Sequence, residues 1–283
     1  MKLLIAKSAG FCFGVKRAME MALEATRRHR PPLYTLGPLI HNPQAVSYLE
    51  TFGIEVRDRV EEIAQGTVIL RSHGVSLTDL QRLKAKRKIR IVDATCPIVK
   101  EAHLHAKFLC RNRYALMIVG DPDHPEVEAI QSYLDGEVVV VRGSEEVSRM
   151  GPWKKLGVIA QTTQSFDRFR DVVRASLSRA KEVRVFNTIC HATTLRQKEA
   201  VEIARKADCM IVIGGYNSAN TRRLGEICRE VQPATYAIET ADEIRPEWLY
   251  KKEKIGVTAG ASTPSWVIEE VVRALRNLHR KGR

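Results

Sequence analysis

One pattern of strands, turns and helices recurs three times along the chain, and this repeat limits the possible folds more than any other feature. Each copy contains a strand that runs into a cysteine and then a helix, at Cys12, Cys96 and Cys190, which are 84 and 94 residues apart. Three further markers keep one order: a strand ending in glycine and a polar loop, a short strand with an acidic turn, and a strand ending in small polar residues. Four ordered markers in three copies indicate an internal repeat of roughly 90 residues.

The alternation of elements within each copy predicts an α/β fold. Strands and helices alternate about four times per copy, which favours parallel βαβ units whose helices cover a sheet. We expect three pseudo-symmetric α/β units with mainly parallel sheets, over residues 1–95, 96–189 and 190–283. The strand expected at residues 2–7 could belong to the first unit or pair with the sheet of the third. No Gly- or Ser-rich linker separates the copies, so we expect them to pack around a common centre.

Charge and hydropathy narrow the functional classes. Lys and Arg outnumber Asp and Glu by 46 to 33, a net charge of +13, which suits nucleic acid, a phosphorylated substrate or an acidic protein partner. A basic surface that is simply solvated, with no partner, would explain the same excess of Lys and Arg. The basic runs lack the interleaved aromatic residues of a nucleic-acid platform. No apolar run approaches the roughly 18 residues of a membrane span, and the N-terminal apolar stretch is too short for a signal peptide, so we expect a cytoplasmic protein.

The six cysteines divide into two groups. In a reducing compartment disulfides are rare, and cysteines serve as packing residues, metal ligands or catalysts. Cys110, Cys209 and Cys228 lie beside apolar neighbours, and we interpret them as packing residues. The three cysteines of the repeat instead follow strands, in the loops where parallel α/β units bind ligands. A pseudo-threefold arrangement of the copies would bring these three thiols together.

Three thiolates without a fourth indicate a particular kind of metal centre. A closed zinc site needs four ligands, commonly from CxxC pairs, and the sequence contains no such pair. A cubane iron–sulfur cluster normally takes four cysteines. With three, one iron keeps an open position that can bind a substrate oxygen as a Lewis acid. The sequence therefore predicts a catalytic iron–sulfur cluster held by one cysteine from each copy.

Two loops in each copy carry polar side chains suited to an anion. They are His41 and Asn42, Ser72 and His73, His124 and Glu126, Thr162 and Thr163, Ser218 and Asn220, and Ser262 and Thr263. Each loop leads to a helix N-terminus, where backbone N–H groups and the helix dipole attract phosphate. Helix capping explains any one of these residues, but the complete set in three copies favours a binding function. The sequence contains neither GxxxxGK[ST] nor GxGxxG, so a nucleotide is not indicated.

His124, Pro125 and Glu126 begin an expected helix. Proline at the first helical position and a carboxylate in the first turn stabilise a helix by themselves. That explanation does not account for the preceding histidine. Beside a metal and an anion, the carboxyl group of Glu126 could instead donate a proton.

Eight short motifs extend over the chain from about residue 3 to about residue 276. They are GFCFGVKRA (10–18), RSHG (71–74), DATCP (93–97), HPEV (124–127), QTT (161–163), TICHATTLRQ (188–197), NSANTRRL (217–224) and GVTAGASTP (256–264). Together they resemble the motifs of the 4-hydroxy-3-methylbut-2-enyl diphosphate reductases, the last enzymes of the non-mevalonate isoprenoid pathway.

The resemblance implies a trefoil-like arrangement of the units around one [4Fe–4S] cluster per chain, with three cysteine ligands and one open iron. The implied ligands are Cys12, Cys96 and Cys190. The implied substrate is an allylic diphosphate, whose hydroxyl is removed with two electrons and protons to give isopentenyl and dimethylallyl diphosphates plus water. Electrons in such enzymes arrive from ferredoxin or flavodoxin, carriers that are typically acidic, so the basic chain has a plausible partner; neither nucleic acid nor membrane is expected as one.

The resemblance also assigns roles to individual side chains. By its position in the matching motif, Glu126 corresponds to the proton source of the family. Thr162 corresponds to a residue close to the substrate hydroxyl. The implied substrate ligands are His41, His73, His124, Thr162, Ser218, Asn220 and Ser262. Among these, His41, His73, Ser218, Asn220 and Ser262 would bind the diphosphate.

The chain departs from the family pattern at a few positions, and other functions remain open. Ala219 stands where a second serine is usual, Tyr216 where lysine is common and Ala129 where glycine is common, which bears on affinity more than on activity. One alternative is a cluster-containing hydro-lyase or reductase acting on another small phosphorylated substrate. A more distant one is a basic nucleic-acid-binding protein with a structural metal, which leaves the threefold polar loops unexplained.

Overall fold

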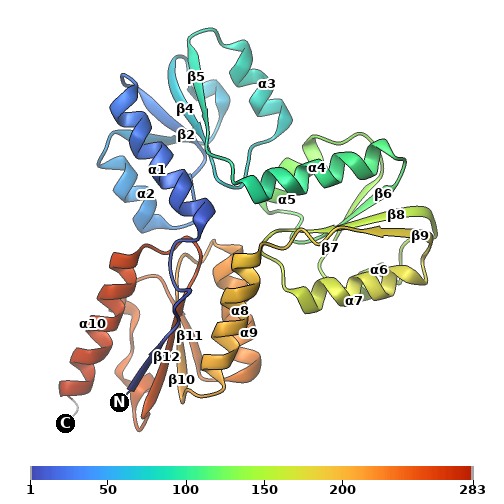
Figure 1. Ribbon diagram of the computed structural model, residues 1–283. Coiled ribbons are helices and arrows are strands. Elements are labelled where there is room, and N and C mark those ends of the chain that lie inside the picture. The colour runs from blue at the N-terminus through green and yellow to red at the C-terminus, as the bar shows by residue number, and fades with distance from the viewer. Residues whose placement is uncertain (1, 282–283) are drawn as a thin grey trace. The chain divides into compact units, whose positions relative to one another are not determined.

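The computed structural model describes residues 2–281 of the chain, with side chains described for residues 2–278. Its strands form three four-stranded sheets, and every described strand pair is parallel (Figure 1). The first sheet has the order β3-β2-β4-β5, the second β7-β6-β8-β9 and the third β1-β12-β10-β11. The three parallel-sheet α/β units predicted from the repeat are therefore confirmed.

The strands are short, as is typical of small parallel sheets. Their bounds are Lys2–Ile5 (β1), Leu33–Leu36 (β2), Ile54–Arg57 (β3), Gly66–Leu70 (β4), Ile89–Asp93 (β5), Ala115–Val119 (β6), Val138–Val141 (β7), Trp153–Ala160 (β8), Ala180–Val185 (β9), Cys209–Ile213 (β10), Thr235–Ile238 (β11) and Lys254–Ala259 (β12).

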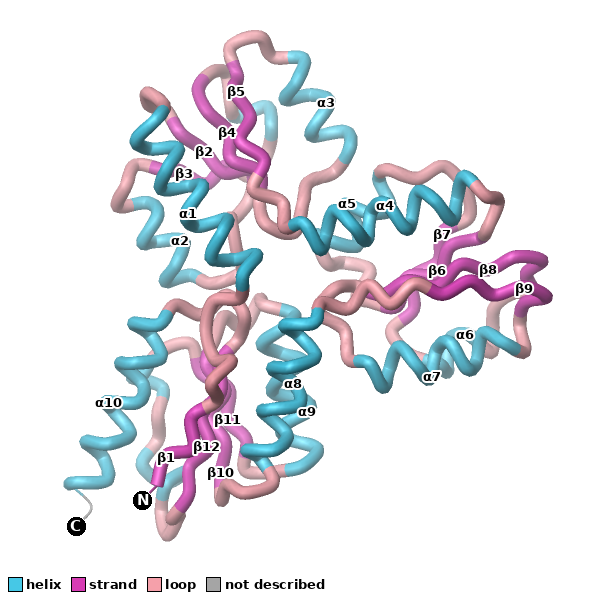
Figure 2. The backbone as a smooth tube through the Cα atoms, viewed as in Figure 1, coloured by secondary structure: helices cyan, strands magenta, loops and turns pink. Residues whose placement is uncertain are grey.

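Helices make most of the connections between strands (Figure 2). The α-helices are Phe13–Arg28 (α1), Pro43–Glu50 (α2), Leu77–Ala85 (α3), Pro97–Arg111 (α4), Pro125–Ser132 (α5), Ser144–Val147 (α6), Phe166–Leu177 (α7), His191–Ala204 (α8), Ala219–Val231 (α9) and Ser265–Lys281 (α10). Three 3₁₀ segments are Val60–Glu62 (η1), Ala241–Glu243 (η2) and Pro246–Leu249 (η3). None of the helices within residues 2–281 has the length and apolar content that crossing a bilayer requires.

The N-terminal strand belongs to the third sheet. Lys2 lies beside Lys254 and Ile5 beside Val257 in a parallel register. All three sheets consequently have one layout, in which the strand that leads to a repeat cysteine lies at an edge, next to the strand that ends in small polar residues. Because parallel strands end at the same side of a sheet, each cysteine loop lies next to a polar loop.

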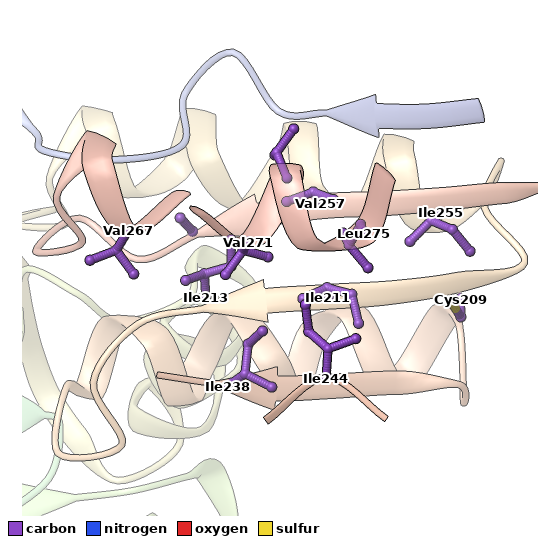
Figure 3. Packing of buried hydrophobic residues seen from close by; sticks show 12 residues of the cluster. Cys209, Ile211, Ile213, Ile238, Ile244, Ile255, Val257, Val267, Val271 and Leu275 are labelled. Carbon is purple, nitrogen blue, oxygen red and sulfur yellow. The ribbon is translucent and has the colours of Figure 1, made fainter. Parts of the chain in front are cut away.

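Both faces of the third sheet are covered. Strand β10 reads Cys-Met-Ile-Val-Ile, an uninterrupted apolar run that is typical of a strand buried on both faces. Ile211 packs with Val271 and Leu275 of α10 (Figure 3), whereas Met210 packs with residues of α8 and α9, including Leu224. Because successive side chains of β10 point to opposite faces of the sheet, the strand packs against helices on both sides.

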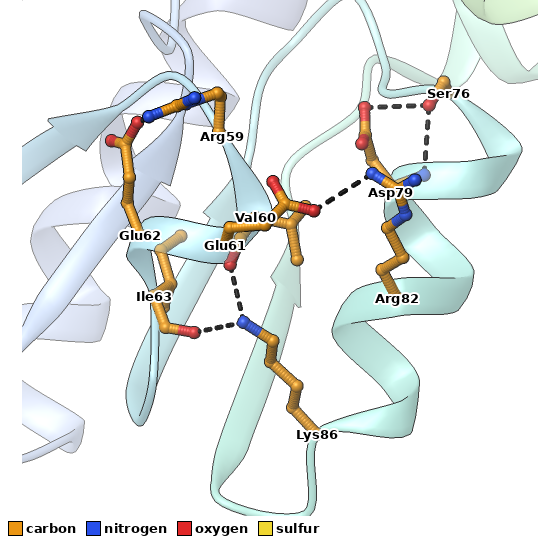
Figure 4. Close-up of polar contacts among 9 residues, drawn as sticks. All are labelled: Arg59, Val60, Glu61, Glu62, Ile63, Ser76, Asp79, Arg82 and Lys86. Carbon is orange, nitrogen blue, oxygen red and sulfur yellow. Dashed lines mark hydrogen bonds and ion pairs between the residues drawn. The ribbon is translucent and has the colours of Figure 1, made fainter.

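The first sheet shows how polar contacts set the ends of a helix (Figure 4). Ser76 precedes α3, and its Oγ accepts a hydrogen bond from the amide of Asp79 at 3.0 Å. At the other end, the Nζ of Lys86 donates to the carbonyl oxygens of Val60 and Ile63, both at 2.6 Å. The two bonds from Lys86 attach the end of α3 to η1 and to the residue after it, across 26 and 23 residues of the chain.

The chain divides into two compact bodies. The first body contains Met1–Lys16, Ile40–Tyr48 and His191–Arg283, and hence the third sheet. The second body contains Arg17–Leu39 and Leu49–Cys190, and hence the first and second sheets. The segment around His41 therefore belongs to the body of the third sheet, although it lies in the first copy of the repeat. The domain boundaries proposed from the repeat remain a prediction.

Candidate active site

The three repeat cysteines have equivalent local surroundings. Each follows an edge strand, precedes a long helix and is partly exposed. Each backbone N–H donates to a carbonyl of the adjacent polar loop: Cys12 to Ala261 at 3.1 Å, Cys96 to Ser72 at 2.9 Å and Cys190 to Thr162 at 2.9 Å. The sequence repeat is thus also a repeat of hydrogen bonding, which gives each cysteine backbone an equivalent position beside its sheet.

The other cysteines differ from these in their surroundings. Cys209 and Cys228 are fully buried, and burial raises the pKa of their thiols to about 11 and about 12. Burial also raises the pKa of Cys110. A metal ligand must be a thiolate. These three cysteines are therefore poorly suited to hold iron, in agreement with the packing role expected of them.

The repeat cysteines fit a metal centre by donor type, accessibility and position. Partly exposed thiols at the start of helices are the type of sulfur that becomes a ligand. Cys12 belongs to the first body, whereas Cys96 and Cys190 belong to the second. Within residues 2–281 the structure groups no three His, Cys, Asp or Glu side chains around one metal position. The convergence of the three thiols therefore remains a prediction.

Four of the predicted diphosphate ligands lie in the first body. The Oγ of Ser262, at the start of the loop after β12, donates to the carbonyl oxygen of His41 at 3.0 Å. On the loop after β10, a Cβ at Gly215 would lie only 2.8 Å from that same oxygen. Ser218 and Asn220 follow on this loop and on α9. The three segments that carry these side chains are therefore in contact, although some 220 residues separate Ser262 from His41.

The start of α9 is suited to an anion. Ser218 is the N-cap, and its Oγ accepts a hydrogen bond from the amide of Thr221 at 3.3 Å. The remaining first-turn amides of a helix have no partner within it and point outward from its end. Asn220 is only 6% exposed, and its Nδ2 has no hydrogen-bond partner among the described residues. A buried amide donor without a partner is unusual, and a bound anion would explain it.

The two departures near this loop have different consequences. Tyr216 fixes the loop: its backbone N–H donates to Oε1 of Glu239 at 2.6 Å, and its hydroxyl bonds to the carboxylate of Glu243. The tyrosine therefore anchors the loop to the turn after β11. Ala219 is the first residue of α9 and offers only its backbone amide to a ligand there.

Glu126 and Thr162 form the centre of the second body's site. Glu126 lies in the first turn of α5 and is 2% exposed. The backbone N–H of Thr162 donates to its Oε1, and the hydroxyl of Thr162 bonds to its Oε2, both at 2.7 Å. The carbonyl of Thr162 accepts from the amide of Cys190. One residue therefore connects the carboxyl group to a repeat cysteine.

The electrostatics of Glu126 suit a proton donor. Burial raises its pKa from 4.5 to about 7, and the two hydrogen bonds from Thr162 oppose the shift without cancelling it. A carboxyl group with this pKa is substantially protonated near neutral pH, and it loses its proton readily. Helix capping does not require such a shift, because an ordinary first-turn carboxylate is exposed and ionised.

His73 and His124 lie close to one another in the second body. Their ring centroids are 6.2 Å apart, and both side chains are buried. His124 is the N-cap of α5, and its Nδ1 accepts a hydrogen bond from the amide of Glu126 at 3.1 Å. The histidine of the HPEV motif therefore caps its helix through Nδ1.

Gln161 is a site residue whose role the sequence did not reveal. Its side chain is buried; Oε1 accepts from the amide of Asp121 at 3.0 Å, and Nε2 donates to Oγ1 of Thr163 at 2.8 Å. It thereby joins the loop after β6 to the loop after β8, the latter carrying Thr162. The available signal was an amide side chain directly after the apolar strand β8.

The predicted residues thus fall into two groups. The first body contains Cys12, His41, Ser218, Asn220 and Ser262, and the second contains Cys96, Cys190, His73, His124, Glu126 and Thr162. The residues predicted to bind the diphosphate are mostly in the first group, and the carboxyl group of Glu126 is in the second.

Comparisons with known proteins agree with this chemistry. The family model described as LytB protein matches residues 3–276. The chain is 52% identical to the 4-hydroxy-3-methylbut-2-enyl diphosphate reductase of Geobacter sulfurreducens, covering 99% of both chains. It is also 52% identical to the protein of that name from Geobacter metallireducens, covering 98% of both.

Two solved structures are similar over 98% of the chain. One is of (E)-4-hydroxy-3-methyl-but-2-enyl diphosphate reductase, the terminal enzyme of the non-mevalonate pathway, at 43% identity, full coverage of that chain and a TM-score of 0.70. The other is of the E-1-hydroxy-2-methyl-but-2-enyl-4-diphosphate reductase from Plasmodium falciparum, at 27% identity, 88% coverage of that chain and a TM-score of 0.91. The chain therefore belongs to the LytB protein family.

Proposed function

We propose that this protein is a 4-hydroxy-3-methylbut-2-enyl diphosphate reductase, an oxidoreductase of isoprenoid biosynthesis. The reaction takes up two electrons and two protons, breaks the allylic C–O bond, and yields isopentenyl or dimethylallyl diphosphate plus water. The observation that carries the proposal is the buried Glu126, with a pKa of about 7, bonded to a threonine whose carbonyl bonds to a repeat cysteine. The relatives at about half identity support the substrate.

We assign Cys12, Cys96 and Cys190 as the ligands of one [4Fe–4S] cluster. When bound, the cluster would relay the electrons from the external donor and provide a Lewis-acidic iron for the hydroxyl oxygen. The support is the repeated placement of three partly exposed thiols beside polar loops, together with the unsuitability of the three remaining cysteines.

The diphosphate is bound by side-chain and backbone hydrogen-bond donors in this proposal. His41, Ser218, Asn220 and Ser262 of the first body and His73 of the second provide side-chain donors, and the first-turn amides of α9 add backbone N–H groups. Binding energy at the phosphates, remote from the reacting carbon, is used to orient the hydroxyl group.

Glu126 is the proton donor. Its protonated carboxyl group delivers a proton toward the departing hydroxyl, and Thr162 holds the carboxyl group through two hydrogen bonds. His124 lies beside it as a further substrate ligand. Burial of the group favours the neutral acid before the reaction and therefore keeps the proton available.

The electron donor is a small acidic carrier such as ferredoxin or flavodoxin. A net charge of +13 favours the encounter with such a protein. We place the reaction in the cytoplasm, where a reducing environment suits iron–sulfur chemistry. The hydro-lyase and nucleic-acid alternatives are not favoured by the relatives.

Metal analysis and turnover test this proposal. Protein purified without oxygen should be brown, contain about four irons and sulfides per chain, and convert the allylic diphosphate when given a one-electron donor. Cys96→Ser should lose iron, whereas Cys110→Ser, which changes a partly exposed cysteine on the helix that Cys96 precedes, should retain it. Full turnover by iron-free protein would refute the assignment. Activity only on other phosphorylated substrates would favour the hydro-lyase alternative.

A further inference from the structure

Two side chains of α8 form hydrogen bonds with the backbone that leads to Cys12. The guanidinium of Arg196 donates from Nε and Nη2 to the carbonyl oxygen of Ser8, at 3.0 and 2.6 Å, and from Nη2 to that of Gly10 at 2.7 Å. The carboxylate of Glu199 accepts from the amides of Lys7 and Ser8, both at 2.8 Å, and from the Ser8 hydroxyl. We name this set the α8 clasp.

The clasp buries a charged side chain, which costs free energy that an ordinary loop does not require. Arg196 is only 3% exposed, and a buried guanidinium must be compensated by well-placed acceptors. The acceptors named above are backbone carbonyls, so the guanidinium fixes the course of the backbone at Ser8 and Gly10. Gly10 has a φ of +103°, and a Cβ there would approach Ile268 at 3.3 Å. The segment before Cys12 is therefore fixed in a conformation that few other residues could adopt.

The clasp has counterparts near the other repeat cysteines. Arg17 on α1, the helix after Cys12, donates to the carbonyl of Thr95, directly before Cys96, at 3.3 Å. His105 on α4, the helix after Cys96, stacks on Phe186 at 4.2 Å, in the segment before Cys190. In each case the helix that follows one cysteine contacts the segment that precedes another. The contact from α8 is multidentate, since Arg196 makes three charge-assisted hydrogen bonds where Arg17 makes one.

We propose that Arg196 and Glu199 are positioning residues for Cys12, which they hold in the geometry that an iron–sulfur cluster requires. The inference rests on the proposed function, because it takes Cys12 as a cluster ligand. A ligand whose chain is fixed in advance loses less conformational freedom when the metal binds. The clasp therefore slows the release of iron from the Cys12 corner without itself touching iron or substrate.

Amide hydrogen exchange of the metal-free protein tests the clasp directly. In Arg196→Gln and in Glu199→Gln, the amides of residues 7–12 should exchange at least about tenfold faster than in the parent, because hydrogen bonds to a charged group are lost. Segments around Cys96 should be unchanged. Lys198→Gln is the matched control, since it removes an exposed positive charge from the same helix. Arg196→Lys should give an intermediate rate, because an ammonium cannot serve two carbonyls in the same way.

Iron retention then tests the role in positioning. With reconstituted protein and an excess of chelator, both Gln variants should release iron about tenfold or more faster than the parent and Lys198→Gln. Equal exchange in residues 7–12 would refute the clasp. Faster exchange with unchanged iron release would refute its role at the cluster. A parent protein that binds no iron would instead refute the proposed function, while the exchange result would still stand.

Discussion

Replacing Glu126 by Gln tests the chemistry of the site and its energetics together. Gln has the size of a protonated Glu, so its carbonyl oxygen can accept from the Thr162 amide and its NH₂ can donate to the Thr162 hydroxyl. The variant should therefore fold and bind substrate. It has no proton to deliver, and we expect turnover to fall by about 10²- to 10⁴-fold with little change in KM.

The pH dependence of stability gives an independent magnitude. The pKa of Glu126 is about 7 in the folded protein, against 4.5 for an ordinary solvated glutamate, so the folded chain holds the proton more tightly than the unfolded chain. Such a group stabilises the fold at low pH, and this contribution disappears as the pH rises through about 7. A shift of this size corresponds to roughly 3 kcal/mol. Above neutral pH the Gln variant should therefore be more stable than the parent by up to this amount.

Urea unfolding of the metal-free protein, followed by circular dichroism between about pH 4.5 and 8.5, measures that difference. The stabilities of parent and variant should be close at the acidic end and diverge as the pH rises. A constant difference across the range would show that Glu126 is already ionised in the fold. That result, or turnover within a few-fold of the parent, would refute the assignment of Glu126 as a proton donor.

Three further substitutions have defined outcomes. Thr162→Val removes one bond that lowers the pKa of Glu126, so the alkaline limb of the turnover–pH profile should move upward; a downward move would contradict this. Ala219→Ser restores a hydroxyl at the first position of α9, and inhibition by inorganic diphosphate should tighten several-fold with kcat unchanged. Lys86→Met removes two hydrogen bonds to carbonyls at and after η1, which should cost about 2 kcal/mol in urea unfolding. An unchanged midpoint would show that solvent replaces those bonds.

Much of the fold was predictable because its signals are local. Apolar runs such as that of β10, and polar residues at strand ends, have meaning within a window of about ten residues. The threefold repeat then extended those signals to the whole chain and identified Cys12, Cys96 and Cys190 as equivalent positions. These positions are also equivalent in the structure, because each cysteine amide donates a hydrogen bond to its neighbouring polar loop.

Tertiary structure decided what depends on contacts between distant segments. The sheet that β1 joins is set by its pairing with residues near 254, which no local pattern encodes. The position of His41 beside Ser262 and the clasp of Arg196 on the Ser8 backbone join segments about 190 to 220 residues apart. Sequence spacing alone cannot specify such partners.

The amino-acid sequence by itself determined the residue types, their order and the class of fold, because period and composition encode them directly. It offered Glu126 as a carboxyl group that could be a helix cap or an acid. Only the tertiary structure shows the surroundings that favour the acid, because it buries the group and places Thr162 against it. The physical reason is that a pKa measures the solvation and hydrogen bonding of a group, and both are set by residues that fold around it from elsewhere in the chain.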